Sequence, residues 1–156
     1  MIKTKAKILI CTGIYPPKVG GPAQYAKNLE KALEQMGYKV RISTYGIENS
    51  LPSGVRHLYY FIKILFEVLW CDAVFVLDTF SVGLPAVLAS RILGKKSIIR
   101  TGGDFLWEQY VERTGKPILL REFYNTERDN LSKKEKLIYI LTKWTLHNVS
   151  HIIFST

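Results

Sequence analysis

The sequence predicts an α/β fold in which helices cover both faces of a parallel sheet. Three observations support this prediction. Short apolar runs typical of strands alternate along the chain with segments of helical periodicity. Several of these runs are continuously apolar, as in strands that are buried on both faces. Glycines and prolines stand where loops and helix ends are expected. The length of 156 residues suits one domain, which we take as 1–156.

The first elements flank a loop that is rich in glycine and proline. We expect a buried strand at 7–11 and, beyond the loop, a helix at 22–36 whose apolar residues recur at helical spacing. Pro22 suits the first turn of this helix, and Gly37 suits the position just past its end. A second strand is expected at 39–43.

The central elements are more apolar. Residues 46–54 hold turn-forming residues throughout and are expected to form a loop. Residues 56–70 are apolar and aromatic and predict a helix, and 72–77 reads as another buried strand. Ser81 is a candidate cap for the next helix, which we expect at 85–93.

The last elements continue the same alternation. We expect a strand at 96–100, a short helix at 104–113, a longer helix at 133–147 that Ser132 opens, and a strand at 151–154. Together the elements predict a Rossmann-like doubly wound sheet, with ligands beyond the C-terminal ends of its strands. A core strand rarely ends such a domain, so we expect the chain to be part of something longer.

The charge of the chain favours anionic partners. Its net charge is +9, from 22 basic and 13 acidic residues, which suits an acidic lipid surface or a phosphorylated substrate. The lysines are scattered rather than gathered in a dense run, so we expect no nucleic-acid partner. The charge and the aromatic residues 59–70 together predict a peripheral contact with a membrane. The rival interpretation buries this helix against the sheet.

The cysteines and histidines show no ligand spacing. Cys11 and Cys71 each end or begin an apolar run, which predicts small buried side chains in a reducing compartment such as the cytoplasm. His57, His147 and His151 are expected to be structural or surface residues. We therefore expect no metal site.

The first candidate site is the loop between the first strand and the first helix. Gly20 and Gly21 would let the backbone approach a ligand closely, and the helix that they open presents free N–H groups that suit a phosphate. The dinucleotide-binding spacing G-x-G-x-x-G is absent. The alternative is a loop that needs glycine only in order to turn.

Two further candidate sites follow later strands. After the strand that ends near Arg100, Asp104 stands at the start of a helix, where it either caps the helix or faces a sugar hydroxyl. After the strand 72–77, the polar run from Asp78 to Ser81 either lines an acceptor site or forms a cap and a solvated loop.

Two of these segments resemble a known family. The run from Tyr15 to Pro22, within 8–37, resembles the opening of family-four GT-B glycosyltransferases. The run from Gly102 to Glu108 resembles a second segment found in one branch of that family, and 72–100 resembles the strands and helix between the two. The resemblance covers nearly the whole chain.

The resemblance implies a division of labour between two Rossmann-like domains. A C-terminal domain grips a nucleotide sugar, and this chain binds the acceptor, a glycan, lipid-linked or small molecule. The sugar is transferred with retention of configuration, without a metal or cofactor. Many members place a histidine after the strand that here ends near Arg100. This sequence has Gly102, Gly103 and Asp104 there, so that role is either open or falls to Asp104, which is the candidate catalytic residue.

The same resemblance implies a role for the two glycines, and the remaining candidates are assigned from their positions in the sequence. Gly20 and Gly21 are placed at the donor phosphates. Acceptor binding is assigned to five residues, which are Tyr25, Asp78, Ser81, Gly103 and Glu108. Without the C-terminal domain, which carries the family's usual acidic pair, the chain is expected to be inactive.

Two other functions stay open. The chain could be a non-catalytic module that binds an anionic glycan or a membrane through its basic surface. It could also be a lone Rossmann-like domain for another nucleotide, although the missing glycine fingerprint counts against this.

Overall fold

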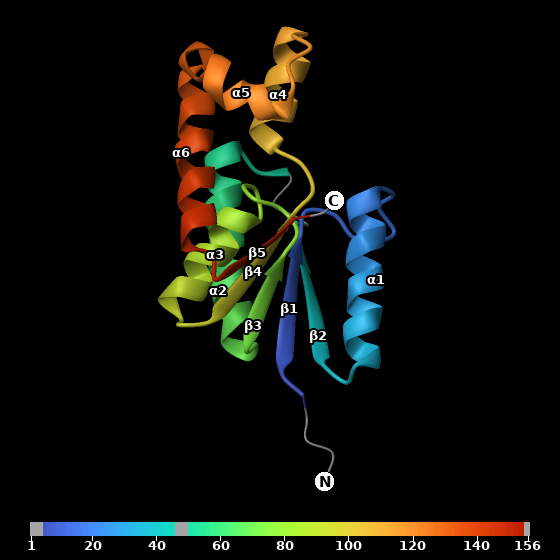
Figure 1. The fold of residues 1–156 in the computed structure, drawn as a ribbon. Coiled ribbons are helices and arrows are strands. Elements are labelled where there is room, and N and C mark those ends of the chain that lie inside the picture. The colour runs from blue at the N-terminus through green and yellow to red at the C-terminus, as the bar shows by residue number, and fades with distance from the viewer. Residues whose placement is uncertain (1–4, 46–49, 155–156) are drawn as a thin grey trace.

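The computed structural model describes residues 5–45 and 50–154 and confirms the Rossmann-like α/β fold. The described strands form one parallel sheet in the order β2-β1-β3-β4-β5 (Figure 1). They are β1 (Lys7–Thr12), β2 (Lys39–Thr44), β3 (Ala73–Val76), β4 (Lys96–Thr101) and β5 (His151–Phe154). The chain leaves β1 on one side to form β2 and returns on the other side to form β3. The loops after β1 and β3 therefore diverge, which opens a crevice at the C-terminal edge of the sheet.

The helices are divided between the two faces of the sheet. Helix α1 (Gly21–Gln35) covers one face, and α2 (Ser53–Trp70), α3 (Gly83–Ile92) and α6 (Lys133–Asn148) lie on the other (Figure 1). Each strand–helix–strand crossover is right-handed. A crossover in one direction along the sheet therefore places its helix on one face, and a crossover in the other direction places it on the opposite face. The described helices include none that is long and apolar enough to cross a membrane.

The main core lies between the sheet and helices α2 and α3. Strand residues such as Leu9, Val74 and Ile99 pack there against Ile64 and Val68 of α2, and all are fully or almost fully buried. Burying apolar surface at this scale is the dominant stabilising term in such a domain. The core holds the strands rigidly, so the loops at the sheet edge start from fixed positions.

A second, smaller apolar cluster lies above the sheet. Helices α4 (Phe105–Thr114) and α5 (Leu120–Thr126) pack against the first half of α6, with Phe123 at the centre of the cluster (Figure 1). We call α4, α5 and the first half of α6 the helical cap. It stands over the C-terminal edge of the sheet, where ligands of such folds bind.

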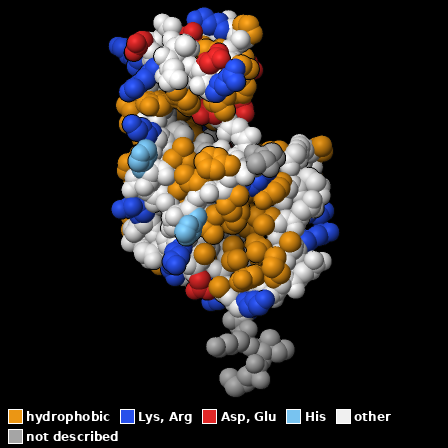
Figure 2. All heavy atoms as spheres, viewed as in Figure 1, with side chains coloured by type: hydrophobic (Ala, Val, Ile, Leu, Met, Phe, Trp, Pro, Cys, Tyr) orange, Lys and Arg blue, Asp and Glu red, His pale blue; other side chains and the backbone are white. Residues whose placement is uncertain are grey.

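The face that carries α1 is only partly covered. Phe75 and Ile98 alternate with buried residues of the core, so they point to the α1 side, where they stay half-buried. Figure 2 shows hydrophobic side chains gathered over the sheet beside α1. Arg100 continues the same alternation along β4, so its side chain lies on this open face.

Most predicted elements are confirmed, including details of their ends. Pro22 lies in the first turn of α1, and Gly37 follows its end with a φ of 87°. Ser132 and Glu135 form a reciprocal capping box at the start of α6. Cys11 and Cys71 are free and buried, as predicted. Of the predicted loop 46–54, residues 46–49 lie outside the described residues.

Two predictions about the helices need correction. Ser81 does not cap α3, which begins at Gly83 after Val82 and has no side-chain cap among the described residues. The Asp78 carboxylate holds the preceding turn instead, accepting the Phe80 N–H at 2.6 Å. Helix α5 was not predicted, because its 7 residues are too few to show a helical period.

Candidate functional site

A cavity opens at the crevice between the divergent loops. Its volume is about 550 Å³, which lies within the usual range for small-molecule sites. Three segments line it: the first turn of α1, residues 77–79 after β3, and parts of 100–108 after β4. These are the C-terminal ends of neighbouring parallel strands, where the sequence predicted ligand contacts.

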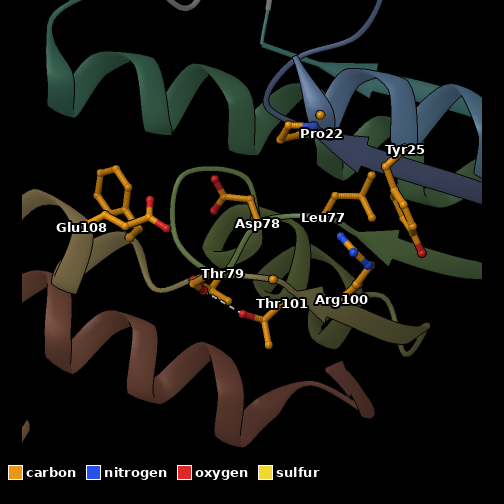
Figure 3. A pocket seen from close by; sticks show the side chains of 12 residues that line it. Pro22, Tyr25, Leu77, Asp78, Thr79, Arg100, Thr101 and Glu108 are labelled. Atoms are coloured by element: carbon orange, nitrogen blue, oxygen red, sulfur yellow. Dashed lines mark hydrogen bonds between the residues drawn. The ribbon is translucent and has the colours of Figure 1, made fainter. Parts of the chain in front are cut away.

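Figure 3 shows two chemically different ends in this cavity. Arg100 and Tyr25 lie side by side at one end, close to the start of α1, and the Asp78 and Glu108 side chains lie at the other. One end is therefore cationic and the other acidic. A ligand with both an anionic group and hydroxyl groups would match this division.

The two glycines before and within the first turn of α1 have different roles. Gly20 is the N-cap residue, with a φ of 157°, and a Cβ there would lie 3.1 Å from Ile14 Cδ1. Gly21 lines the cavity, and a Cβ there would meet no described atom within 4 Å. No side chain of the described residues caps α1, so its first N–H groups stay available at the cavity. Gly20 shapes the turn, and Gly21 faces the ligand space.

The cationic end is built by two elements. The Arg100 guanidinium carbon lies 3.8 Å from the centre of the Tyr25 ring, a close cation–π contact between β4 and α1. In the described part of the chain no carboxylate pairs with Arg100, so its charge is directed to the cavity. Tyr25 was predicted as a site residue, whereas Arg100 was missed. The available signal was a charged residue near the end of a buried strand, where ligands of such sheets bind.

Asp78 stands at the acidic end and follows β3. Its Oδ1 accepts the Phe80 N–H, and burial raises the pKa of its carboxyl despite this support from the backbone. Ser81, predicted beside it, does not line the cavity; its carbonyl accepts the Tyr45 hydroxyl at 2.6 Å. Within the run from Asp78 to Ser81, Asp78 and Thr79 thus line the cavity, and Ser81 belongs to the turn.

Glu108 reaches the cavity from the first turn of α4. Burial raises the pKa of its carboxyl, and the nearby charges of Asp104 and Asp78 raise it further. A Cβ at Gly103 would collide with Glu108 Oε1, so glycine is needed for the carboxylate to lie where it does. The Thr101 hydroxyl donates to the Gly103 carbonyl at 2.9 Å and fixes this turn.

Asp104 occupies a structural position behind these residues. Its Oδ1 accepts the Trp107 N–H at 2.8 Å, which confirms the predicted capping of the helix. Its Oδ2 accepts the Tyr124 hydroxyl at 2.6 Å, and burial together with this bond raises the pKa of Tyr124. Asp104 does not line the cavity. Its assigned catalytic role stays a prediction, and the carboxylates that do line the cavity are Asp78 and Glu108.

The described residues show no cluster of metal ligands, and His57 packs among aromatic rings. No group of three His, Cys, Asp or Glu side chains among them could hold a metal ion. His57 packs edge-on against the rings of Tyr45 and Phe80, and burial lowers its pKa. This position suits the structural role that the sequence predicted for it.

A scan against protein-family models found no match for the chain, and a search of curated protein sequences found no significant match. The resemblance to family-four GT-B glycosyltransferases therefore stays a prediction, and the functional argument rests on the residues of the cavity.

Proposed function

We propose that this chain is the acceptor-side domain of a retaining GT-B glycosyltransferase. The observation that carries the proposal is the two-ended cavity at the sheet edge, cationic at Arg100 and acidic at Asp78 and Glu108. A sugar transferase must hold donor phosphates beside sugar hydroxyls, and these two ends match those two needs.

The cationic end suits the donor phosphates. Helix α1 has 15 residues, and its first turn borders the cavity without a capping side chain from the described residues. The positive end of the helix dipole and the free N–H groups attract anions, and Arg100 adds a full charge. Gly21 leaves the room for a phosphate to approach the backbone.

The acidic end suits the hydroxyl groups of a sugar. Carboxylates are strong acceptors, and an acceptor hydroxyl between Asp78 and Glu108 would meet two of them. Burial raises the pKa of both the Asp78 and the Glu108 carboxyl, which is common for carboxyl groups at functional sites. In this proposal Asp104 positions Glu108, because it caps the helix that carries Glu108.

The proposed activity requires a donor-binding domain, in the same polypeptide or as a partner. The chain by itself is expected to bind ligands weakly and to transfer no sugar. A non-catalytic glycan- or anion-binding module would use the same cavity, but it would not discriminate between nucleotide sugars.

The test is a titration of the chain with a panel of nucleoside diphosphate sugars, followed by NMR. We expect one of them to shift the signals of Gly21, Arg100 and Gly103. Gly21→Val should weaken that binding by at least about tenfold, equivalent to about 1.4 kcal/mol, by filling the space for the phosphate.

Gly54→Val is the matched control. Gly54 also lies in the first turn of a helix, and a Cβ there would likewise meet no described atom within 4 Å. Both variants should therefore stay folded. The proposal fails if no nucleotide sugar shifts the cavity signals, or if inorganic phosphate shifts them equally. Equal binding by the two variants would also contradict it.

A further inference from the structure

Helix α2 is apolar on two opposite sides. Its inner side places Tyr60, Ile64 and Val68 in the main core, where all three are fully buried. Its outer side carries six apolar side chains whose exposed fractions lie between 48% and 68%. We call them the α2 stripe: Val55, Leu58, Tyr59, Ile62, Phe66 and Leu69. The sequence predicted a membrane contact for this segment, with burial against the sheet as the rival, and α2 has both a buried side and an exposed apolar side.

The α2 stripe is continuous along the helix. Its members recur at spacings of three or four residues, with one spacing of a single residue, so they share one side of a helix of 18 residues. A helix that packs on the sheet of a water-soluble domain normally presents a polar side to the solvent. A contiguous exposed apolar surface instead marks a binding surface. We therefore expect a binding partner to cover the α2 stripe.

Basic side chains adjoin the end of the stripe. Trp70 is the last residue of α2, and the Arg41 guanidinium lies 4.0 Å and Lys7 Nζ 5.7 Å from its ring. Lys7 is aligned with Lys39 on β2, and Lys96 begins β4 at the same edge of the sheet. Three lysines therefore gather at the N-terminal edge of the sheet, on the side opposite the cavity, where Asp72 accepts the Lys7 backbone N–H at 2.8 Å.

We propose that the α2 stripe docks into the surface of an anionic lipid bilayer, with the lysine edge against the headgroups. An interfacial helix has an apolar side flanked by basic and aromatic residues; here Trp70 ends α2, and Arg41 of β2 and Lys7 of β1 lie against its ring. The net charge of +9 selects this occupant, because a second copy of the chain would bring the same positive charge, whereas anionic lipids neutralise it. The inference does not depend on the proposed sugar transfer.

The test measures co-sedimentation of the chain with vesicles of phosphatidylcholine and phosphatidylglycerol, beside vesicles of phosphatidylcholine alone. We expect binding to the anionic vesicles at low salt and much weaker binding to the neutral ones. The double variant Ile62→Asp with Phe66→Asp should lower the partition coefficient by at least about tenfold, since it places two charges in the apolar contact.

The matched control changes two exposed apolar residues of another helix. Leu137→Asp with Ile140→Asp alters side chains of α6 that are 55% and 60% exposed, so it adds the same charge outside the stripe. It should weaken binding far less than the stripe variant. Circular dichroism checks that each variant is folded, and the milder Phe66→Ser replaces the stripe variant if that one is not.

Three results would overturn the proposal. The first is no binding of the unmodified chain to anionic vesicles at low salt. The second is equal weakening by the two double variants, which would indicate a general charge effect. The third is a dimer in light scattering that the stripe variant dissociates while vesicle binding stays unchanged, which would assign the stripe to a second copy.

Discussion

The sheet body and the helical cap above it are stabilised by different interactions. The body relies on a continuous apolar core between the sheet and helices α2 and α3. The cap has a small aromatic cluster tied together by polar bonds at its rim. Trp107 Nε1 donates to the Ile118 carbonyl, Lys116 pairs with Glu127 at 2.8 Å, and Arg113 pairs with Glu135 at 2.9 Å.

This difference bears on the cavity, because the body supplies its cationic end and Asp78, whereas the cap supplies Glu108. Gly21 and Arg100 belong to the body, whereas Glu108 belongs to α4 of the cap. Smaller apolar clusters open at lower free-energy cost than main cores do. We therefore expect the wall that carries Glu108 to adjust its position while the cationic end stays fixed. The predictions below test whether the two regions respond separately.

The largest effect on stability is expected from truncating a buried side chain at the centre of each region. Phe123→Ala in the cap should lower the free energy of opening of α4 and α5 by about 3–5 kcal/mol, and Ile99→Ala in the body should lower global stability by about 2–5 kcal/mol. Both residues are fully buried. Hydrogen exchange should show lost protection in the cap alone for the first variant and in both regions for the second. Lost protection in β1 and β3 after Phe123→Ala would mean that the regions are one unit.

A smaller effect is expected at the ion pair that joins α4 to α6. Arg113 contacts Glu135 through two nitrogens, and the Glu135 side chain is only 7% exposed. In Arg113→Ala the Glu135 carboxylate keeps the hydrogen bond from the Ser132 N–H but loses both bonds from the guanidinium. This loss should lower the free energy of unfolding by about 1–3 kcal/mol. The control is Arg121→Ala, since the Arg121–Glu122 pair is exposed and should cost about 0–1 kcal/mol. Equal effects in urea unfolding would contradict the distinction.

Acid should weaken the cap before the body. The hydrogen bond from Lys116, with those from Tyr110 and Asn130, lowers the pKa of Glu127 from its ordinary 4.5 to about 2. A carboxyl whose pKa is lower in the folded state stabilises the fold above pH 4.5, and this contribution is lost as the pH falls towards 2. Near-ultraviolet circular dichroism should follow the loss, because the cap is aromatic. Glu127→Gln should remove this pH dependence, and an unchanged acid transition in the variant would refute the assignment.

The smallest effect on stability is expected from Asp104→Asn. Asparagine caps a helix about as well as aspartate, and the lost acceptor for Tyr124 should cost about 1 kcal/mol or less. Asp104→Ala should cost more, since it removes both bonds. Thermal unfolding of the two variants measures the difference. A large loss of sugar transfer by Asp104→Asn in the complete enzyme, with stability unchanged, would instead support the catalytic role assigned from the sequence.

The sequence by itself determined the order of the strands and helices, apart from α5, and the parallel arrangement of the strands. Patterns of apolar residues within a few turns carry this information, because burial on one side of a helix or both sides of a strand leaves a local period. Helix-capping signals are local as well, so Gly37 and Ser132 correctly indicated the ends of their helices. The same local signals placed Gly21, Tyr25, Asp78, Gly103 and Glu108 near the C-terminal ends of strands, and all of these line the cavity.

Only the tertiary structure decided how those residues are used. Arg100 becomes a site residue because strand alternation directs it to the face where α1 brings Tyr25. Asp104 is turned from the cavity by Tyr124, which lies 20 residues further along the chain. The outer side of α2 is exposed because no described helix packs over it, a fact that depends on the whole topology. Contacts between distant segments leave no period in the sequence, so these outcomes depended on the assembled fold.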